Sequence, residues 1–387
     1  MNVTTVTDAQ RWRGLMAIVV SVGLAGVILG LFAPLIALKL EHRAISTTWN
    51  GINAAMPAIA AIAVAPFLPR LTVAFGLLRT VLAGVVITVA VVPLFVVFDE
   101  TWVWFVLRFV MGVGGMMHWV TTEIWINAAV PDHHRGKVLG ANATAFSAGM
   151  ASGPLLLGFI GTEGNLPFII ATGIVALGAA PLVFAIGTAP PVHEPEKGAF
   201  VDAVRRAPTP MMASLVEGFL FVALLVLWPI YAVRSGFDET AAITMLTVIV
   251  IGQIVASFPI GWLADHMNRK LLLIANGVAS LICALLLPVL LDSPVMLYVM
   301  LFLWGAASAG LYTLGMVRLG ETFAARDLGS ATAVFILVTQ IGSVAGPILG
   351  GAGMDAWNPH GFVVVTALVG ALFCAFAIWR YVSVECR

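Results

Sequence analysis

The amino-acid sequence predicts an all-helical integral membrane protein. Of its 387 residues, 61% are apolar and only 10% are charged, whereas about 25% of the residues in a typical soluble domain are charged. The apolar residues form long runs along the whole chain, much longer than the roughly ten-residue alternating strands of a membrane β-barrel. This composition excludes a soluble enzyme and a nucleic-acid-binding protein that relies on a basic surface.

The apolar runs define the predicted spans. A helix needs about 20 apolar residues to cross the hydrocarbon core of a bilayer, and the chain divides into twelve such segments at charged residues, Pro, Gly and Asn. The first run is too long for the core of a signal peptide, so we expect it to be retained. The predicted spans are 13–38, 47–69, 77–98, 102–126, 136–159, 166–187, 210–233, 240–262, 270–291, 295–317, 329–351 and 361–383.

One joint between spans differs from the others. Most joints are very short, whereas residues 188–209 contain four prolines and six charged residues. We therefore predict an N-terminal six-helix bundle over 1–187, a linker over 188–209 and a C-terminal six-helix bundle over 210–387.

Basic residues predict the orientation of the spans, because cytoplasmic segments of membrane proteins are enriched in Lys and Arg. With the N-terminus in the cytoplasm, fifteen of the 19 basic residues fall in inner segments and three in outer ones, and Arg108 lies within a span. We expect both termini and the linker to be cytoplasmic.

The fifth and eleventh spans carry the same pattern of glycine and proline. Small residues four positions apart let helices approach closely. The pattern comprises Gly149, Gly153 and Pro154 in the fifth span, and Gly342, Gly346, Pro347 and Gly350 in the eleventh.

Together with two further motifs, this repeat resembles the major facilitator superfamily of secondary transporters. Residues 261–270, GWLADHMNRK, are similar to that family's loop motif, with Asn268 in place of a glycine. Arg108-x3-Gly112-x-Gly114 is similar to its fourth-span motif. The resemblance covers essentially the whole chain and implies two pseudo-symmetric bundles of six helices.

The resemblance also implies a function. In that family the glycine–proline pattern is associated with proton-driven antiporters; the eleventh-span copy is complete, and the fifth has Leu157 in place of a glycine. We therefore expect alternating access at the cytoplasmic membrane and proton-coupled efflux of a small molecule. The alternatives are proton-coupled uptake of an organic anion or metabolite, and a receptor or assembly protein with this fold that transports nothing.

The loop motif implies a conformational latch. In the resembled family its Asp helps to hold the cytoplasmic side closed, and here that residue is Asp265, with Arg269 beside it. We place Asp265 near the start of the fifth span and Arg135, where a helix N-terminus stabilises a carboxylate. The corresponding loop after the second span has Val73 at the Asp position, so we predict one such latch instead of two.

Two carboxyl groups within the spans are candidates for proton coupling. A charge inside the bilayer is costly and therefore indicates a function, and a reversible proton carrier must exist in both protonated and charged forms. Glu217 lies about two turns into the seventh span, on a helix that lines the cavity in the resembled family. Glu123 lies near the inner end of the fourth span, where a gate or an ion pair is the favoured role.

The candidates for substrate binding lie in both predicted bundles. Arg108 is a permanent cation, which can bind an anionic group or brace neighbouring helices by donating to backbone carbonyls. Trp228 and Tyr231 fit either an aromatic wall or anchors at the membrane interface. The remaining candidates are His118, Trp304, Tyr312 and Gln340.

Several kinds of site are not expected. His118 has no second His or Cys at ligand spacing, so we predict no metal site, and three cysteines are too few for a disulfide framework. The sequence contains no recognisable nucleophile–base pair and no phosphate-binding loop. We therefore expect neither an enzyme nor a cofactor. The expected partners are a small-molecule substrate, protons and the lipid bilayer, with no nucleic acid, and we expect a monomer.

Overall fold

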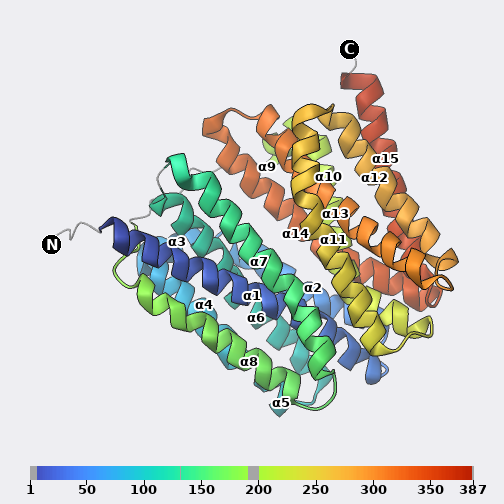
Figure 1. Cartoon of the computed structure of the whole chain (residues 1–387), viewed down its shortest axis with the longest axis horizontal. Coiled ribbons are helices and arrows are strands. Elements are labelled where there is room, and N and C mark those ends of the chain that lie inside the picture. Colours follow the sequence, from blue (N-terminus) through green and yellow to red (C-terminus); the bar gives the residue numbers. More distant parts are fainter. Residues whose placement is uncertain (1–6, 131, 191–199, 386–387) are drawn as a thin grey trace. The chain divides into compact units, whose positions relative to one another are not determined.

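The computed structural model describes residues 7–130, 132–190 and 200–385. All regular structure in these ranges is helical (Figure 1). The α-helices are α1 (Asp8–His42), α2 (Thr47–Val64), α3 (Leu68–Phe75), α4 (Leu77–Val91), α5 (Leu94–Val97), α6 (Thr101–Ala129), α7 (Asp132–Ile160), α8 (Leu166–Ala179), α9 (Phe200–Arg206), α10 (Pro208–Arg234), α11 (Glu239–His266), α12 (Arg269–Leu286), α13 (Pro294–Thr322), α14 (Ala325–Ala356) and α15 (Gly361–Arg380). Three short helical segments of other types are η1 (Ala180–Ala185), η2 (Leu287–Val289) and η3 (Tyr381–Glu385).

The number of spans depends on one broken helix. Within the described residues, eleven segments are long and apolar enough to cross a membrane, and α2 with α3 gives a twelfth if the pair is one span. The pair is bent by 65°, so the predicted second span, 47–69, is not one continuous helix. Pro66 and Pro69 explain the break, because proline lacks an N–H group and disfavours helical backbone in the residue before it.

The chain folds into two compact units. Unit 1 comprises residues 1–35 and 59–195, and unit 2 comprises residues 36–58 and 196–387. Helices α1 and α2 therefore contribute to both units, and the joint between them belongs to unit 2. Pro34 inside α1 and Pro57 inside α2 lie next to the points where the chain passes from one unit to the other.

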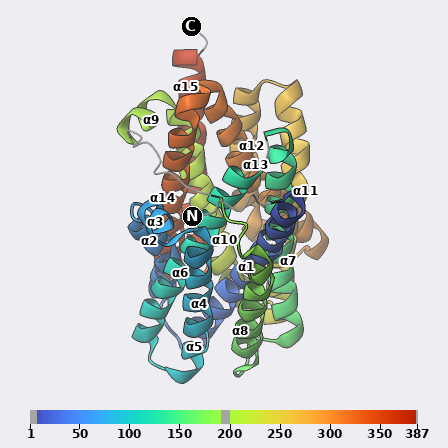
Figure 2. The same ribbon diagram turned by 90° about the vertical axis from the view of Figure 1, so that its left-hand side faces the viewer.

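Unit 1 is held together by apolar and aromatic packing. Helix α4 packs against α6 and α8, and the three run alongside one another (Figure 2). Phe32 of α1 contacts Phe95 and Phe168 edge-on, with ring centroids 5.1 and 5.7 Å apart. The fully buried Trp104 packs against the same rings, and its indole N–H donates to the carbonyl of Phe98 at 2.8 Å.

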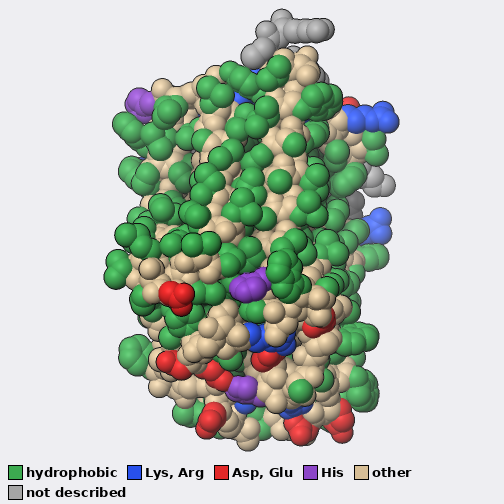
Figure 3. Space-filling view, turned by 90° about the vertical axis from the view of Figure 1, so that its right-hand side faces the viewer, with side chains coloured by type: hydrophobic (Ala, Val, Ile, Leu, Met, Phe, Trp, Pro, Cys, Tyr) green, Lys and Arg blue, Asp and Glu red, His purple; other side chains and the backbone are tan. Residues whose placement is uncertain are grey.

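Unit 2 is built around two helix pairs, α10 with α14 and α11 with α13. Its outward side is strongly apolar: large hydrophobic side chains of α12, α13 and α15 are exposed, among them Leu285, Val299 and Leu368. Figure 3 shows one face on which hydrophobic side chains predominate and charged side chains gather towards one end. Such a surface is suited to lipid, since an apolar patch this extensive is rare on soluble proteins.

The predicted linker contains a helix. Helix α9 spans Phe200–Arg206, immediately before α10. Ala203 is buried in an apolar cluster that also contains Leu319, Phe335 and other residues of unit 2. The guanidinium carbon of Arg206 lies 4.5 Å from the centroid of the Phe323 ring. The second part of the linker is therefore packed against unit 2.

Candidate functional site

Arg108 is a buried cation in α6 of unit 1. Arg108 lies about two turns after the start of α6. The residue is only 4% exposed, and its Nε is buried without a hydrogen-bond partner among the described residues. Within the described part of unit 1, no carboxylate or backbone carbonyl pairs with its guanidinium. A buried charge without a partner is costly, which keeps Arg108 a candidate for binding an anionic group.

The glycines near Arg108 allow α6 to approach α4 closely. A methyl group on Gly114 would lie 2.7 Å from the carbonyl oxygen of Gly84, and one on Gly84 would lie 2.6 Å from that of Gly114. Neither helix can accept a side chain at this crossing without shifting its backbone. The Arg-x3-Gly-x-Gly motif thus combines a buried cation with a close helix contact.

His118 lies further along α6 and is also buried, with 5% exposure. Its Nε2 is 2.9 Å from the hydroxyl of Ser21 in α1, so one ring nitrogen is already used within unit 1. Among the described residues, no group of three His, Cys, Asp or Glu side chains could hold a metal ion. These contacts favour a structural role for His118 in joining α6 to α1.

Glu123 lies near the end of α6, where its side chain is half-buried. Its backbone carbonyl accepts a hydrogen bond from Asn127, at 2.9 Å. Its carboxylate has no partner among the described residues of unit 1. The predicted partner Arg135 has a side chain that lies outside the described residues.

Glu217 is half-buried in α10 of unit 2, beside one of several tight contacts between α10 and α14. A methyl group on the adjacent Gly218 would overlap the carbonyl oxygen of Thr339, and Gln340 is the next residue of α14. Within the described part of unit 2, the carboxylate of Glu217 has no hydrogen bond or ion pair. An acidic side chain is thus held in a largely apolar helix without a fixed partner.

The predicted aromatic residues of unit 2 occupy different environments. Trp304 is fully buried and its indole N–H donates to the hydroxyl of Ser280 at 3.1 Å, which favours a packing role. Trp228 and Tyr231 are also fully buried, which excludes them as anchors at the membrane interface. Tyr312 is half-buried, with its ring 5.4 Å from that of Phe335.

The two glycine–proline patterns pack the fifth and eleventh spans onto helices of their own unit. In unit 1, a methyl group on Gly149 of α7 would overlap the carbonyl oxygen of Gly23 in α1, and Gly153 likewise lies against Leu31. These contacts leave no room for larger residues.

In unit 2, Gly342 and Gly346 of α14 lie against the carbonyl oxygens of Leu215 and Phe219 in α10. Gly350 of α14 faces the side chain of Leu227, which also belongs to α10. The pattern therefore sets the closest approach of α14 to α10, the helix that carries Glu217.

One end of unit 2 carries a cluster of charged residues, which we call the Asp265 end. Arg269 contacts Asp265 at 3.5 Å and Glu321 at 2.6 Å. Arg318 pairs with the same Glu321 at 2.8 Å. The sequence singled out Asp265 and Arg269 but not Glu321, which links the two arginines. The third residue of the predicted latch, Arg135, is outside the residues whose side chains are described.

The opposite end of unit 2, which we call the Asp355 end, holds the start of α2. Asp355 of α14 accepts hydrogen bonds from the backbone N–H groups of Thr47 and Thr48, at 2.9 and 2.8 Å, and from both hydroxyl groups. Arg234 pairs with Glu41 through two bonds of 2.7 and 2.9 Å. The sequence analysis did not predict these contacts. The opposite charges of Glu41 and Arg234, both in predicted outer segments, were a signal for the ion pair.

Comparison with known proteins then identifies the family. The model of the Major Facilitator Superfamily matches residues 15–249 and 210–385, which together cover nearly the whole chain. The chain belongs to the Major Facilitator Superfamily. The resemblance inferred from the sequence motifs is thereby confirmed at the level of the superfamily, and with it the all-helical membrane fold.

Relatives and solved structures are consistent with this assignment. An uncharacterized MFS-type transporter of Bacillus subtilis (strain 168), YfkF, is 26% identical over 371 residues, which is 94% of each chain. The crystal structure of the nucleoside transporter NupG matches with a TM-score of 0.78 at 12% identity, over 95% of this chain and 99% of that one. The D-xylose–proton symporter matches with a TM-score of 0.72 at 16% identity, over 94% and 97%.

These likenesses make the chain an MFS-type transporter and not an enzyme. At 12–16% identity, the two solved structures show a shared fold only. The relatives of bacterial origin indicate a multi-pass protein of the cell membrane.

Proposed function

We propose that this transporter exports small, partly apolar compounds in exchange for protons, with Glu217 as the proton carrier. The observation that supports this most directly is the carboxylate of Glu217, which is half-buried in α10 and has no partner among the described residues of unit 2. A carboxyl group in a transmembrane helix must be neutralised by a proton or a ligand, and a fixed salt bridge would prevent such an exchange.

The proposed cycle uses alternating access. Glu217 takes up a proton from outside, the substrate leaves, the site turns towards the cytoplasm, and the proton is released there. In this cycle Gln340 and Tyr312, which are half-buried on α14 and α13, contact the substrate, and the termini are cytoplasmic. The tight glycine contact between α10 and α14 limits the space beside Glu217, which reduces proton leakage through unit 2.

Proteoliposomes with an imposed pH gradient test this proposal. Ethidium serves as a probe of partly apolar compounds, and an internal pH dye reports proton flux. We expect the wild-type protein to move ethidium and protons in opposite directions. Glu217→Gln should abolish this exchange while the protein still folds, whereas Glu163→Gln, a substitution in the loop after α7, should leave it unchanged. Proton-coupled ethidium flux through Glu217→Gln would rule out Glu217 as the carrier.

A second candidate function is uptake of an organic anion together with protons. Arg108 favours it, because its buried guanidinium has no partner among the described residues of unit 1 and such a cation suits a carboxylate. Benzoate is the probe: co-transport with protons that is lost in Arg108→Gln and partly kept in Arg108→Lys supports uptake by symport. Benzoate flux that is equal in the wild type and Arg108→Gln excludes Arg108 as its binding residue.

A further inference from the structure

The short helix α3 of unit 1 lies at an angle to the helix before it. It follows α2 after a bend of 65°. Its eight residues, Leu68–Phe75, give a helix about 12 Å long, whereas the hydrocarbon core of a bilayer is about 30 Å thick. Leu68 and Thr72 are buried, because α3 packs against α4 and α6. One side of α3 is therefore fixed to the body of unit 1.

The other side of α3 is apolar and uncovered. Phe67, Val73 and Phe75 are 58%, 45% and 58% exposed, and Ala74 is exposed as well. No other described segment of the chain covers these side chains. Exposure of large apolar side chains to water is unfavourable, so this side of α3 is suited to contact with the apolar part of a bilayer.

Two arginines accompany the apolar side chains. Arg70 in α3 and Arg79 in the first turn of α4 are exposed, and neither side chain has an ion pair or hydrogen bond with another described residue. The sequence contains no Asp or Glu between Glu41 and Asp99, so the charge of this region is purely basic. Apolar side chains combined with basic ones are typical of helices that lie in the membrane–water interface and attract anionic lipids.

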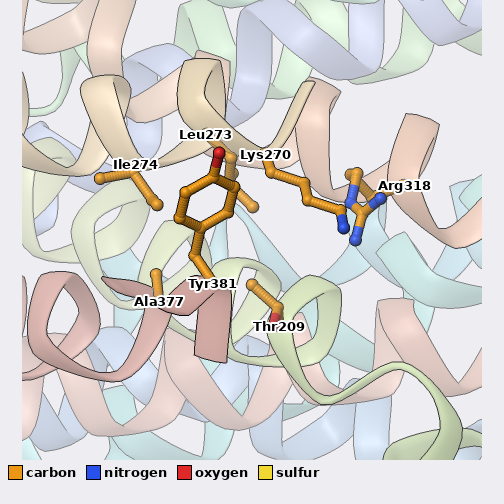
Figure 4. A pocket seen from close by; sticks show the side chains of 7 residues that line it. All are labelled: Thr209, Lys270, Leu273, Ile274, Arg318, Ala377 and Tyr381. Atoms are coloured by element: carbon orange, nitrogen blue, oxygen red, sulfur yellow. The ribbon is translucent and has the colours of Figure 1, made fainter. Parts of the chain in front are cut away.

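The basic side chains at the Asp265 end of unit 2 differ in this respect. Lys270 and Arg318 line a pocket (Figure 4), but both have contacts with other residues, and Arg318 pairs with Glu321 at 2.8 Å. The pocket itself has room for about one water molecule. The arginines at α3 are better placed to bind a group from outside the protein.

Val73 fits the same interpretation. It stands where the loop motif of the resembled family has an Asp, and its side chain belongs to the exposed apolar side of α3. A carboxylate at this position would be repelled by anionic head groups and would be costly to insert among lipids. The replacement of Asp by Val thus removes a latch residue and extends the apolar side of the helix.

We propose that α3 lies in the membrane–water interface and binds the head groups of anionic lipids through Arg70 and Arg79. The guanidinium groups donate charge-assisted hydrogen bonds to phosphate oxygens, and the exposed apolar side chains enter the boundary of the acyl chains. Because α2 and α4 hold α3 beside the membrane, this short helix needs no large membrane affinity of its own. The joint after the second span is expected on the cytoplasmic side, where anionic lipids are enriched.

The proposal is independent of the transport cycle, because no residue of α3 takes part in it. A fluorescent probe on α3 tests it in vesicles. Ala74→Cys is labelled with an NBD dye in the full chain, after Cys283, Cys374 and Cys386 are replaced by alanine. The aqueous control is the same dye on Glu163→Cys, in the exposed loop after α7. We expect lipids with a nitroxide near the head group to quench the dye at position 74, and aqueous iodide to quench it at position 163.

The preference between head groups tests the role of the arginines. Vesicles of phosphatidylcholine receive the nitroxide either on phosphatidylglycerol or on phosphatidylcholine, and we expect phosphatidylglycerol to quench the dye at position 74 more strongly. Arg70→Gln and Arg79→Gln should each lower this preference, by at most about fivefold. The matched control is Arg205→Gln, which removes an exposed positive charge from α9 in unit 2 and should leave the preference unchanged.

Three results would overturn the proposal. Iodide quenching as strong at position 74 as at position 163 would place α3 in water. Protection from iodide without quenching by either lipid would show that protein covers this side of α3. Equal quenching by the two lipids, or a preference unchanged in both arginine variants, would exclude binding of anionic head groups through Arg70 and Arg79. Iodide quenching at position 163 is measured in every variant to show that the fold is retained.

Discussion

The two ends of unit 2 are stabilised in different ways. At the Asp355 end, residues 36–58 from the first half of the sequence belong to the unit and are held by four hydrogen bonds to the carboxylate of Asp355 and by a part-buried bidentate ion pair. At the Asp265 end, ion pairs join residues of α11, α12 and α13, which are consecutive in the sequence, and Asp265 itself is 71% exposed. The comparison indicates that the Asp355 end contributes more to stability, whereas the contacts of the Asp265 end can change at little cost.

The strongest test of this comparison uses glycine contacts. A methyl group on Gly351 would overlap the carbonyl oxygen of Thr47, an atom of the backbone that cannot rotate away. We expect Gly351→Ala to lower the free energy of unfolding by about 1–3 kcal/mol, the usual cost of overpacking. Unfolding titrations in detergent micelles measure this change.

The matched control is Gly320→Ala near the Asp265 end, where no atom lies within 4 Å of an added Cβ. Replacement of a helical glycine by alanine there should raise stability by about 0.5–1 kcal/mol. Equal effects of Gly351→Ala and Gly320→Ala would contradict the difference between the two ends.

The next largest effect is expected for Asp355→Asn. The carboxylate accepts backbone hydrogen bonds at the start of α2, as well as bonds from two hydroxyl groups. Asparagine keeps one acceptor oxygen and loses the charge, so we expect a loss of about 1–2 kcal/mol. Asp292→Asn, in the exposed joint before α13, is the control and should have no measurable effect; an Asp355→Asn protein as stable as that control would disprove the capping role.

A smaller effect is expected for the ion pair of Glu41 and Arg234. Their side chains are 17% and 21% exposed, so the pair is only partly screened by solvent. A double-mutant cycle with Glu41→Gln and Arg234→Gln should give a coupling energy of about 1 kcal/mol. The same cycle on Asp265 and Arg269, which are 3.5 Å apart, should give less than about 0.5 kcal/mol. Coupling of similar size at both ends would contradict the comparison.

The smallest effect on stability is expected for Asp265→Asn, within about 0.5 kcal/mol of the wild type. Its expected consequence is functional: removal of the proposed latch should shift the balance between inward-open and outward-open states and change the transport rate. Accessibility of an introduced cysteine to a water-soluble reagent measures that balance. Unchanged accessibility and unchanged transport would show that Asp265 is no latch.

The helical architecture could be predicted from the sequence because burial in lipid imposes a simple rule on composition and length. The motifs correctly indicated the family. The glycine pattern was a prediction of close helix packing, and an added methyl group at Gly149 or Gly342 would meet a backbone carbonyl oxygen. The break in the second span was missed because the apolar run continues through Pro66, and length was given more weight than backbone chemistry.

The candidate site was less predictable, because it depends on what each polar residue contacts. The sequence identified Arg108 and Glu217 as charges within spans, but only the structure shows that both have no partner among the described residues of their units. Trp304 was expected to contact the substrate, yet Ser280, a residue 24 positions away in another helix, satisfies its indole. Such pairings are tertiary and leave no local pattern in the sequence.

The passage of α1 and α2 through both units has a mechanical consequence. Each helix continues from one unit into the other, so a rotation between the units would bend both helices. Pro34 and Pro57 lie next to those two crossing points, and each removes a hydrogen bond from the helix and lowers its stiffness against bending. We expect bending to concentrate at these two prolines, while the hydrogen bonds of Asp355 and the ion pair of Glu41 stay intact.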